Sequence, residues 1–418
     1  MVSVEEAFLV VAMIIFVGYF GLLFFKKTKI SEIIILMIIG LVLGPIVGFI
    51  GQTEIGAFQD FLPFFASFAL LVILFEGGMQ LNFFKTLRSL PGAFLFTLIV
   101  FILTLILITT TWFIFTQNFL QGLLLGAILG GTSSAIVIPI VNSTSAKEET
   151  KTLLGLESAL TDALCVIVAV TIAQIILLLN TGNGASVTLS GIGTSLLGAF
   201  CIAAVLGVIF GFVWLKLLTF FEKKPYEYLV TLAALLFLYS IAQMFGGNGA
   251  IAALVFGIVL GNSEDLTNML KFTPRKLEST IKSFQMEVSF IVRTFFFVYL
   301  GLLFKPTFLS DWFVIISALV ILATIIIARF IGSILISKVN KIFIDDKLII
   351  TAIGSRGLAA ASLMSAPIIV SLPLGPVFNQ MAAIVFLVIF GSNILTTIGT
   401  FISENNFKKK ISSESVIQ

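Results

Sequence analysis

Six ionisable residues lie inside long apolar stretches, where charged side chains are rare. A charge at the centre of a membrane-spanning helix costs about 2.5–3.5 kcal/mol on insertion scales, and arginine keeps its proton inside a protein. The six charges sum to zero. They therefore indicate either structural pairing of arginines with carboxylates or an ion or proton pathway, the usual role of such groups. The residues are Glu76, Glu157, Asp162, Arg293, Arg329 and Arg356.

The segment Glu157-Ser158-Ala159-Leu160-Thr161-Asp162 carries two of these carboxylates. On a helix, Ser158 and Asp162 share one face and Glu157 and Thr161 share another, with the two carboxylates about 140° apart. A hydroxyl beside a carboxylate offers hard oxygen ligands for a small alkali cation, and the other face can hold an arginine. Asp162 lies about 11 residues into its span, hence roughly 16 Å deep. A carboxylate that holds either a proton or a cation there is the minimum requirement for exchange.

The composition excludes most other chemistry. The chain is 59% hydrophobic and 11% charged and has no histidine, whereas soluble domains have about 25% charged residues. This excludes soluble enzymes, nucleic-acid partners, histidine metal sites and an imidazole pH switch, and we expect no cofactor and no enzymatic activity. Cys165 and Cys201 lie in apolar runs and are predicted to be buried structural thiols.

The apolar runs predict an all-α polytopic membrane protein. About thirteen spans of helical length follow the chain, and the polar stretch Ser263–Phe284 is predicted to be an amphipathic surface helix. The predicted spans are 5–25, 31–50, 59–82, 91–116, 119–145, 151–179, 190–219, 226–245, 248–262, 286–304, 312–337, 346–371 and 377–402.

The basic residues orient these spans. Twenty of the 24 lysines and arginines fall in alternate loops and in the C-terminal tail, and the opposite loops hold only Lys305. The positive-inside rule places the twenty in the cytoplasm, with the N-terminus outside. We predict a cell-membrane protein whose first span is not a cleaved leader and whose single membrane domain, 1–418, has no soluble regulatory domain.

Two spans are interrupted by residues that make poor helices. The fifth contains Gly130-Gly131-Thr132-Ser133-Ser134, and the twelfth contains Gly354-Ser355-Arg356-Gly357. Glycine weakens a helix, and hydroxyl side chains offer its backbone other partners. Close packing of small residues is an alternative reading of any one glycine. Two matched breaks of opposite direction, however, are typical of inverted-repeat transporters and their binding sites.

Four motifs together resemble those of the monovalent cation:proton antiporters, and specifically the NhaP-like sodium/proton antiporters. They are Phe75-Glu76-Gly77-Gly78, Gly131-Thr132-Ser133-Ser134, Glu157–Asp162 and Gly354–Gly357, and the resemblance covers essentially the whole chain. It implies an NhaA-like fold with two crossed discontinuous helices, a homodimer, a core subdomain (91–179 and 312–402) and an interface subdomain (5–82 and 190–304). An elevator-like movement of the core would give alternating access.

The resemblance also implies roles for individual residues. Asp162 would carry the proton or bind Na⁺, helped by Ser158, Thr132 and Glu76, with Thr161 and Ser133 in support. Glu157 would pair with Arg356. Apart from the resemblance, we predict that Arg293 pairs with Glu76 or lines an inner funnel and that Arg329 braces the core.

One position departs from the family pattern. Thr161 stands where NhaP-like proteins usually have asparagine and electrogenic relatives have aspartate. Because threonine is uncharged, we predict electroneutral exchange of Na⁺ or Li⁺ for H⁺. A K⁺/H⁺ antiporter is the alternative of the same family, and a cation channel or uniporter is a more remote one. Sodium or lithium ions, protons, membrane lipid and a second copy of the chain are the expected partners.

Overall fold

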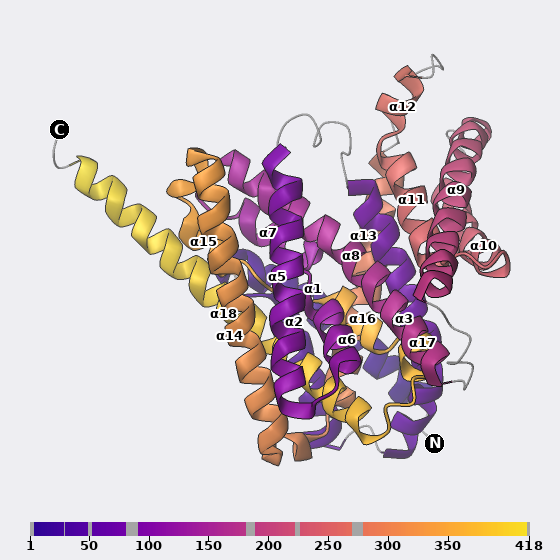
Figure 1. The fold of residues 1–418 in the computed structure, drawn as a ribbon, viewed down its shortest axis with the longest axis horizontal. Helices are drawn as coiled ribbons and strands as arrows, with labels where there is room; N and C mark the ends of the chain where they lie inside the picture. The colour runs from indigo at the N-terminus through magenta and orange to yellow at the C-terminus, as the bar shows by residue number, and fades with distance from the viewer. Residues whose placement is uncertain are drawn as a thin grey trace.

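The structure is a computed structural model that describes residues 4–28, 30–48, 52–80, 91–180, 189–221, 226–269 and 279–415. Helices occupy nearly all of these residues, as the apolar runs predict (Figure 1). The first half of the chain forms α1 (Val4–Thr28), α2 (Glu32–Leu41) with a π-helical turn (Val42–Ile46), α3 (Gln52–Gln80), α5 (Pro91–Thr116), α6 (Phe119–Leu129), α7 (Ser134–Asn142) and α8 (Glu148–Asn180). The second half forms α9 (Leu189–Phe221), α10 (Glu227–Met244), α11 (Gly249–Gly261), α12 (Ser263–Met269), α13 (Ser279–Leu303), α14 (Trp312–Val339), α15 (Lys347–Ala352), α16 (Leu358–Met364), α17 (Pro367–Val370) and α18 (Pro376–Ser415), with 3₁₀ turns η3 (Pro306–Ser310) and η4 (Lys341–Ile344).

Every predicted span coincides with a helix or with a group of consecutive helices in the described part of the chain. Eight stretches are long and apolar enough to cross a membrane by themselves, and one of them combines α6 and α7. Four shorter apolar helices lie in α1, α2, α3 and α11. The all-α membrane fold is therefore confirmed, and the number of thirteen crossings stays a prediction.

The helices pack in two groups. In one, α5 lies against α6 and α14, α8 against α6 and α7, and α18 against α14 and α15. In the other, α11 lies between α3 and α9, and α13 lies against α2 and α3. Helix α3 also contacts α8 and α16 and so lies where the groups meet. The predicted core and interface subdomains and their relative movement stay predictions.

Glycines bring α3 and α11 into close contact. A side chain at Gly78 would collide with the backbone of Leu254, and one at Gly257 would collide with Phe75. In lipid, helices associate through packing of small residues because no hydrophobic effect drives them together. The glycine of the Phe75–Gly78 motif therefore fixes where α3 and its Glu76 lie.

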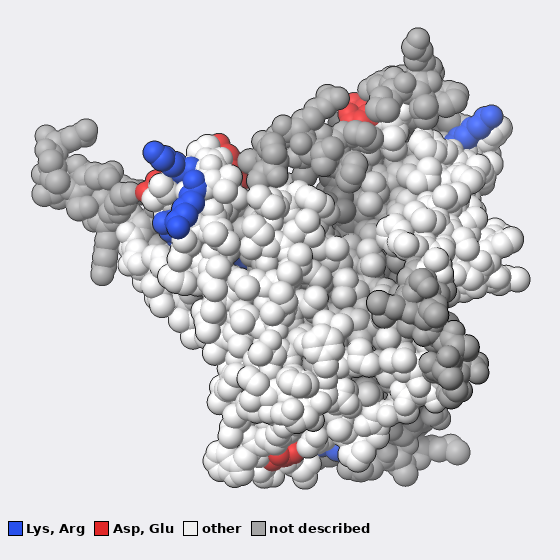
Figure 2. All heavy atoms as spheres, in the orientation of Figure 1, with Lys and Arg blue, Asp and Glu red and all other residues white. Residues whose placement is uncertain are grey.

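Charge is segregated toward the two ends of the molecule. In the view of Figure 2, blue lysine and arginine atoms gather at the upper ends of α14 and α9, and a broad band without colour separates them from a small charged area at the lower edge. The marked chain termini also lie toward opposite ends in Figure 1. Trp312, which is 76% exposed, begins α14 at the lower end, the position at which tryptophan marks a membrane interface.

Two predictions made outside the site need revision. Cys165 is buried as predicted, but Cys201 is exposed on the outer face of α9, because an apolar run in a membrane helix can face lipid as well as protein. The predicted surface helix over Ser263–Phe284 begins as α12, yet α13 already starts at Ser279. Residues 270–278 between them lie outside the described residues.

Candidate functional site

Both predicted breaks are present, and they contact each other. Helix α6 ends at Leu129 and α7 starts at Ser134, while α15 ends at Ala352 and α16 starts at Leu358. The backbone N–H of Ser133 donates to the carbonyl of Ser355 at 2.9 Å. Gly357 lies so close to Ser133 that an added Cβ would collide with its side chain. The two discontinuous helices therefore meet at their non-helical residues, which leaves two carbonyl ends and two amide ends buried in protein.

Arg356 satisfies the carbonyl ends. Its side chain is fully buried, its Nε donates to the Leu129 carbonyl of α6 at 2.9 Å, and its Nη1 donates to the Gly354 carbonyl at 2.8 Å. A cation is favourable at helix C-termini because the last carbonyls have no partner in the helix. The predicted pairing of Arg356 with Glu157 is wrong in this structure, since the ion pair of Glu157 is made with a different arginine.

That arginine is Arg329 of α14. Its Nη1 and Nη2 donate to the two carboxylate oxygens of Glu157 at 2.8 and 3.2 Å, and both side chains are 1% exposed. Its Nε and Nη2 also donate to the Ile350 carbonyl at 3.2 and 2.9 Å, near the end of α15. Arg329 therefore joins α8, α14 and the first half of the second broken helix, which agrees with the predicted bracing role. Sequence could not choose between the two arginines, because either could reach the Glu157 face.

Thr132 and Thr161 attach the first break to the Glu157 face of α8. The Thr132 hydroxyl donates to Glu157 Oε1 at 3.3 Å, and its backbone N–H donates to the Thr161 hydroxyl at 3.1 Å. The structure therefore places Thr132 beside Glu157, whereas the resemblance implied a role beside Asp162. Thr161 binds the backbone of the break, and its predicted role in supporting the ion site stays a prediction.

Asp162 lies at the amide end of α7. Its Oδ2 accepts from the backbone N–H of Ser134 at 3.2 Å and from the Ser134 hydroxyl at 2.8 Å. The residue is only 6% exposed, and its Oδ1 accepts no hydrogen bond from the described residues. Helix N-termini stabilise negative charge through their free N–H groups and dipole. Ser134 thus fixes one carboxylate oxygen of Asp162.

Ser134, which had no predicted role, is the residue that touches Asp162. As the first residue after the break it occupies the start of a half-helix, the position where backbone amides face an anion. Ser158 shares the face of Asp162, but its hydroxyl donates to the Gly155 carbonyl at 2.9 Å. Ser133 supports the site through its backbone bond to Ser355.

Glu76 and Arg293 belong to a polar group on α2, α3 and α13. Glu76 Oε1 accepts from Gln80 Nε2 at 3.0 Å, and its carboxylate also interacts with Ser289. Arg293 is one helical turn beyond Ser289, and its Nη2 contacts Glu32 Oε1 at 2.9 Å. The predicted direct pair of Arg293 with Glu76 is therefore replaced by a pair with Glu32. Sequence reasoning overlooked Glu32 because it is the first residue of α2, where acidic side chains are common.

Polar side chains of α18 hold the second break in place. The hydroxyls of Ser392 and Thr396 accept from the backbone N–H groups of Arg356 and Gly354, and Asn393 Nδ2 donates to the Arg356 carbonyl. These side chains replace the backbone bonds that the break removes. Ser392, Asn393 and Thr396 are polar residues close together in an otherwise apolar span. This pattern could have indicated a polar contact of α18 from the sequence.

Comparisons with known proteins place the chain in a family. The family model described as "Sodium/hydrogen exchanger, transmembrane" matches residues 11–403. The chain belongs to this family. The solved sodium proton antiporter MjNhaP1 from Methanocaldococcus jannaschii at pH 8 has a TM-score of 0.77 at 22% identity, covering 96% of this chain and 98% of that chain. The fold is thus that of a solved antiporter structure, as the resemblance implied.

The names of two curated relatives specify different cations. The K(+)/H(+) antiporter NhaP2 of Shewanella oneidensis is 28% identical over 337 residues, 79% of this chain and 56% of that protein. The Na(+)/H(+) antiporter 1 of Methanocaldococcus jannaschii is 26% identical over 353 residues, 81% of this chain and 78% of that protein. The chain spans little more than half the length of the NhaP2 relatives that it matches.

Proposed function

We propose that the chain is a secondary antiporter that exchanges Na⁺ or Li⁺ for H⁺, with proton and cation competing for Asp162. The observation that carries this proposal is the burial and hydrogen bonding of the Asp162 carboxylate. Asp162 is buried at the junction of α7 and α8, with Oδ2 bound to Ser134 and Oδ1 free of hydrogen bonds from the described residues. A buried carboxylate is costly when uncompensated, so it takes up a proton or a cation in each transported state.

The buried charges support one-for-one exchange. Glu157 and Arg329 cancel each other, and Arg356 and ionised Asp162 also cancel. Binding either H⁺ or a monovalent cation changes the charge at Asp162 by the same amount. Thr161 adds no titratable group. Replacing one proton by one cation therefore moves no net charge, and the exchange is electroneutral.

We propose that Glu76, one of the predicted cation ligands, lies on the route by which a cation reaches Asp162. Glu76 and Ser289 face each other across α3 and α13, beside the Glu32–Arg293 pair. These groups lie on the side of the molecule assigned to the cytoplasm, which suits a funnel that gathers cations. Ser158 and Thr132 remain proposed ligands, because hydroxyls that donate to Gly155 and Glu157 keep oxygen lone pairs that can bind a cation.

The proposed movement uses the two helix groups. A core unit of α5–α8 and α14–α18 would slide against α2, α3, α11 and α13 and expose Asp162 to each side in turn. We propose that the protein works as a homodimer in the cell membrane, with its N-terminus outside. The extensive hydrogen bonding at the breaks supports movement of the core as one body, because bending there would strand buried polar groups.

Potassium is the second candidate cation, supported by the names of the NhaP2 relatives, whereas the name of the Methanocaldococcus relative supports sodium. Purified protein in liposomes with an imposed pH gradient should release protons when Na⁺ or Li⁺ is added. A response to K⁺ alone would assign the alternative. Cation flux that continues without opposite proton movement and generates current would instead identify a channel or uniporter.

A further inference from the structure

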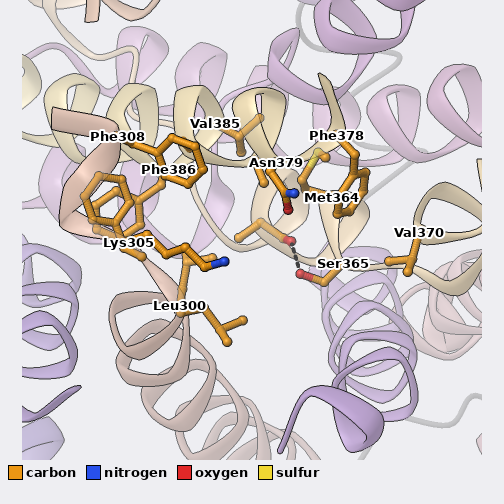
Figure 3. Close-up of a pocket in the computed structure, with 15 residues that line it drawn as sticks. Leu300, Lys305, Phe308, Met364, Ser365, Val370, Phe378, Asn379, Val385 and Phe386 are labelled. Carbon is orange, nitrogen blue, oxygen red and sulfur yellow. Dashed lines mark hydrogen bonds between the residues drawn. The ribbon is translucent and has the colours of Figure 1, made fainter. Parts of the chain in front are cut away.

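A further feature of the structure lies at the end of the molecule that carries Trp312. It is a pocket of about 320 Å³ between the C-terminal end of α13, the helix α16 and the first turns of α18. Aromatic rings, among them Phe308 and Phe386, form one wall (Figure 3). Phe304 stacks on Phe386 at a centroid distance of 4.2 Å. Aliphatic side chains such as Leu300 and Val370 form much of the remainder.

Lys305 places a positive charge in this apolar pocket. Figure 3 shows its side chain extending along the pocket, with the ammonium group between Leu300 and Ser365. Lys305 makes no ion pair or side-chain hydrogen bond with any described residue. The nearby acidic residue Asp311 is already engaged, because it accepts from the Phe313 N–H and from Gln380.

The position of the pocket indicates its surroundings. Lys305 precedes the turn η3, and two apolar residues that follow, Leu309 and Trp312, are 50% and 76% exposed. Exposed tryptophan at the end of a membrane helix marks the headgroup level of a bilayer. A lysine at that level above an apolar crevice matches an amphiphile with a negative headgroup and a hydrocarbon tail.

We propose that this pocket binds one anionic phospholipid from the leaflet on the Lys305 side, with the phosphate at the Lys305 ammonium and an acyl chain along the apolar wall. The exposed amide of Asn379 lies on the same pocket and can donate to the headgroup. The positive charge of Lys305 favours an anionic phospholipid over a zwitterionic one, because a zwitterionic headgroup has no net negative charge to balance it.

This lipid would lie between the two helix groups. Leu300 and Phe304 belong to α13 and the segment after it, whereas Ala361 and Phe386 belong to α16 and α18. If the core moves as proposed above, the lipid lies where the groups slide, and anionic lipid would change the exchange rate. That consequence rests on the proposed function, whereas binding itself does not.

The test measures lipid binding without transport. Delipidated protein in mild detergent is titrated with phosphatidylglycerol or phosphatidylcholine, and bound lipid is counted by native mass spectrometry. Wild type should retain one phosphatidylglycerol preferentially. Lys305→Gln should weaken it about fivefold, the factor that corresponds to about 1 kcal/mol for one lysine near an anionic surface. Ala382→Phe, which fills the apolar part, should also weaken retention.

Lys341→Gln is the matched control, because Lys341 is an exposed lysine at the opposite end, in η4. Equal losses in Lys341→Gln and Lys305→Gln would overturn the proposal by showing general charge attraction. Unchanged retention in Lys305→Gln would overturn it as well. Glycerol phosphate, which lacks acyl chains, should compete poorly, and full competition by it would replace the lipid site with a simple anion site.

Discussion

Replacing Arg329 with methionine should leave Glu157 as an uncompensated charge in the protein interior. Both side chains are 1% exposed, and the change removes two charge-assisted hydrogen bonds of 2.8 and 3.2 Å. Among the described residues, only the Thr132 hydroxyl, at 3.3 Å, would still donate to the Glu157 carboxylate. Breaking one side of a buried ion pair costs about 3–5 kcal/mol.

This cost can be measured as a loss of thermal stability. For a chain of 418 residues that unfolds as one unit, with about 2.1 cal/mol/K of unfolding entropy per residue, the melting temperature should fall by about 3–6 °C. Thermal unfolding in detergent followed by tryptophan fluorescence gives this value. Folding of the variant is checked by size-exclusion chromatography, and the wild type is measured under the same conditions.

A double-mutant cycle identifies the partner. Glu157→Gln removes the stranded charge, so it should recover about 1–3 kcal/mol in the Arg329→Met background. In the Arg356→Met background it should recover at least about 1 kcal/mol less, because Arg356 bonds to the carbonyls of Leu129 and Gly354. Coupling of Glu157 to Arg356 that equals or exceeds its coupling to Arg329 would refute the pairing described here.

Two further changes test the first break and its contacts. Ser134→Ala removes the 2.8 Å bond to Asp162 and should change the apparent cation affinity of exchange by about 3–10-fold, whereas Ser158→Ala, whose hydroxyl bonds to the backbone, should change it less. The affinity is measured as KM in liposomes. A larger change in Ser158→Ala than in Ser134→Ala would show that Ser158, and not Ser134, is the hydroxyl that matters at the site. Gly357→Ala forces a Cβ against Ser133 and should cost about 1–3 kcal/mol, visible as a lower melting temperature; an unchanged value would show that the two breaks do not pack as described.

Much of the fold could be predicted from the sequence, because the bilayer imposes simple rules. Apolar runs of the right length became helices, and the glycine-rich interruptions at 130–133 and 354–357 became non-helical segments in contact. Helical periodicity also separated the Asp162 face from the Glu157 face of α8. These features depend on residues close in sequence, so local physics is enough to predict them.

The partners of the buried arginines could not be predicted in the same way. Arg329, Arg356 and Glu157 are far apart in sequence, and the choice among them depends on the angle at which α14 and the second break approach α8. Charge balance shows that partners must exist, but it does not assign them. Ser134 illustrates the same limit, because its contact with Asp162 depends on where the α7 half-helix begins relative to α8.

The role of Asp162 is tested most directly by proton movement in liposomes that contain Asp162→Asn. Asparagine has nearly the same size and can still accept from Ser134, but it cannot carry a proton or neutralise a cation. Na⁺, Li⁺ and K⁺ should all fail to drive proton release, while the variant keeps its elution profile and melting temperature close to wild type. Cation-driven proton release that persists in Asp162→Asn would show that Asp162 is not the group at which proton and cation compete.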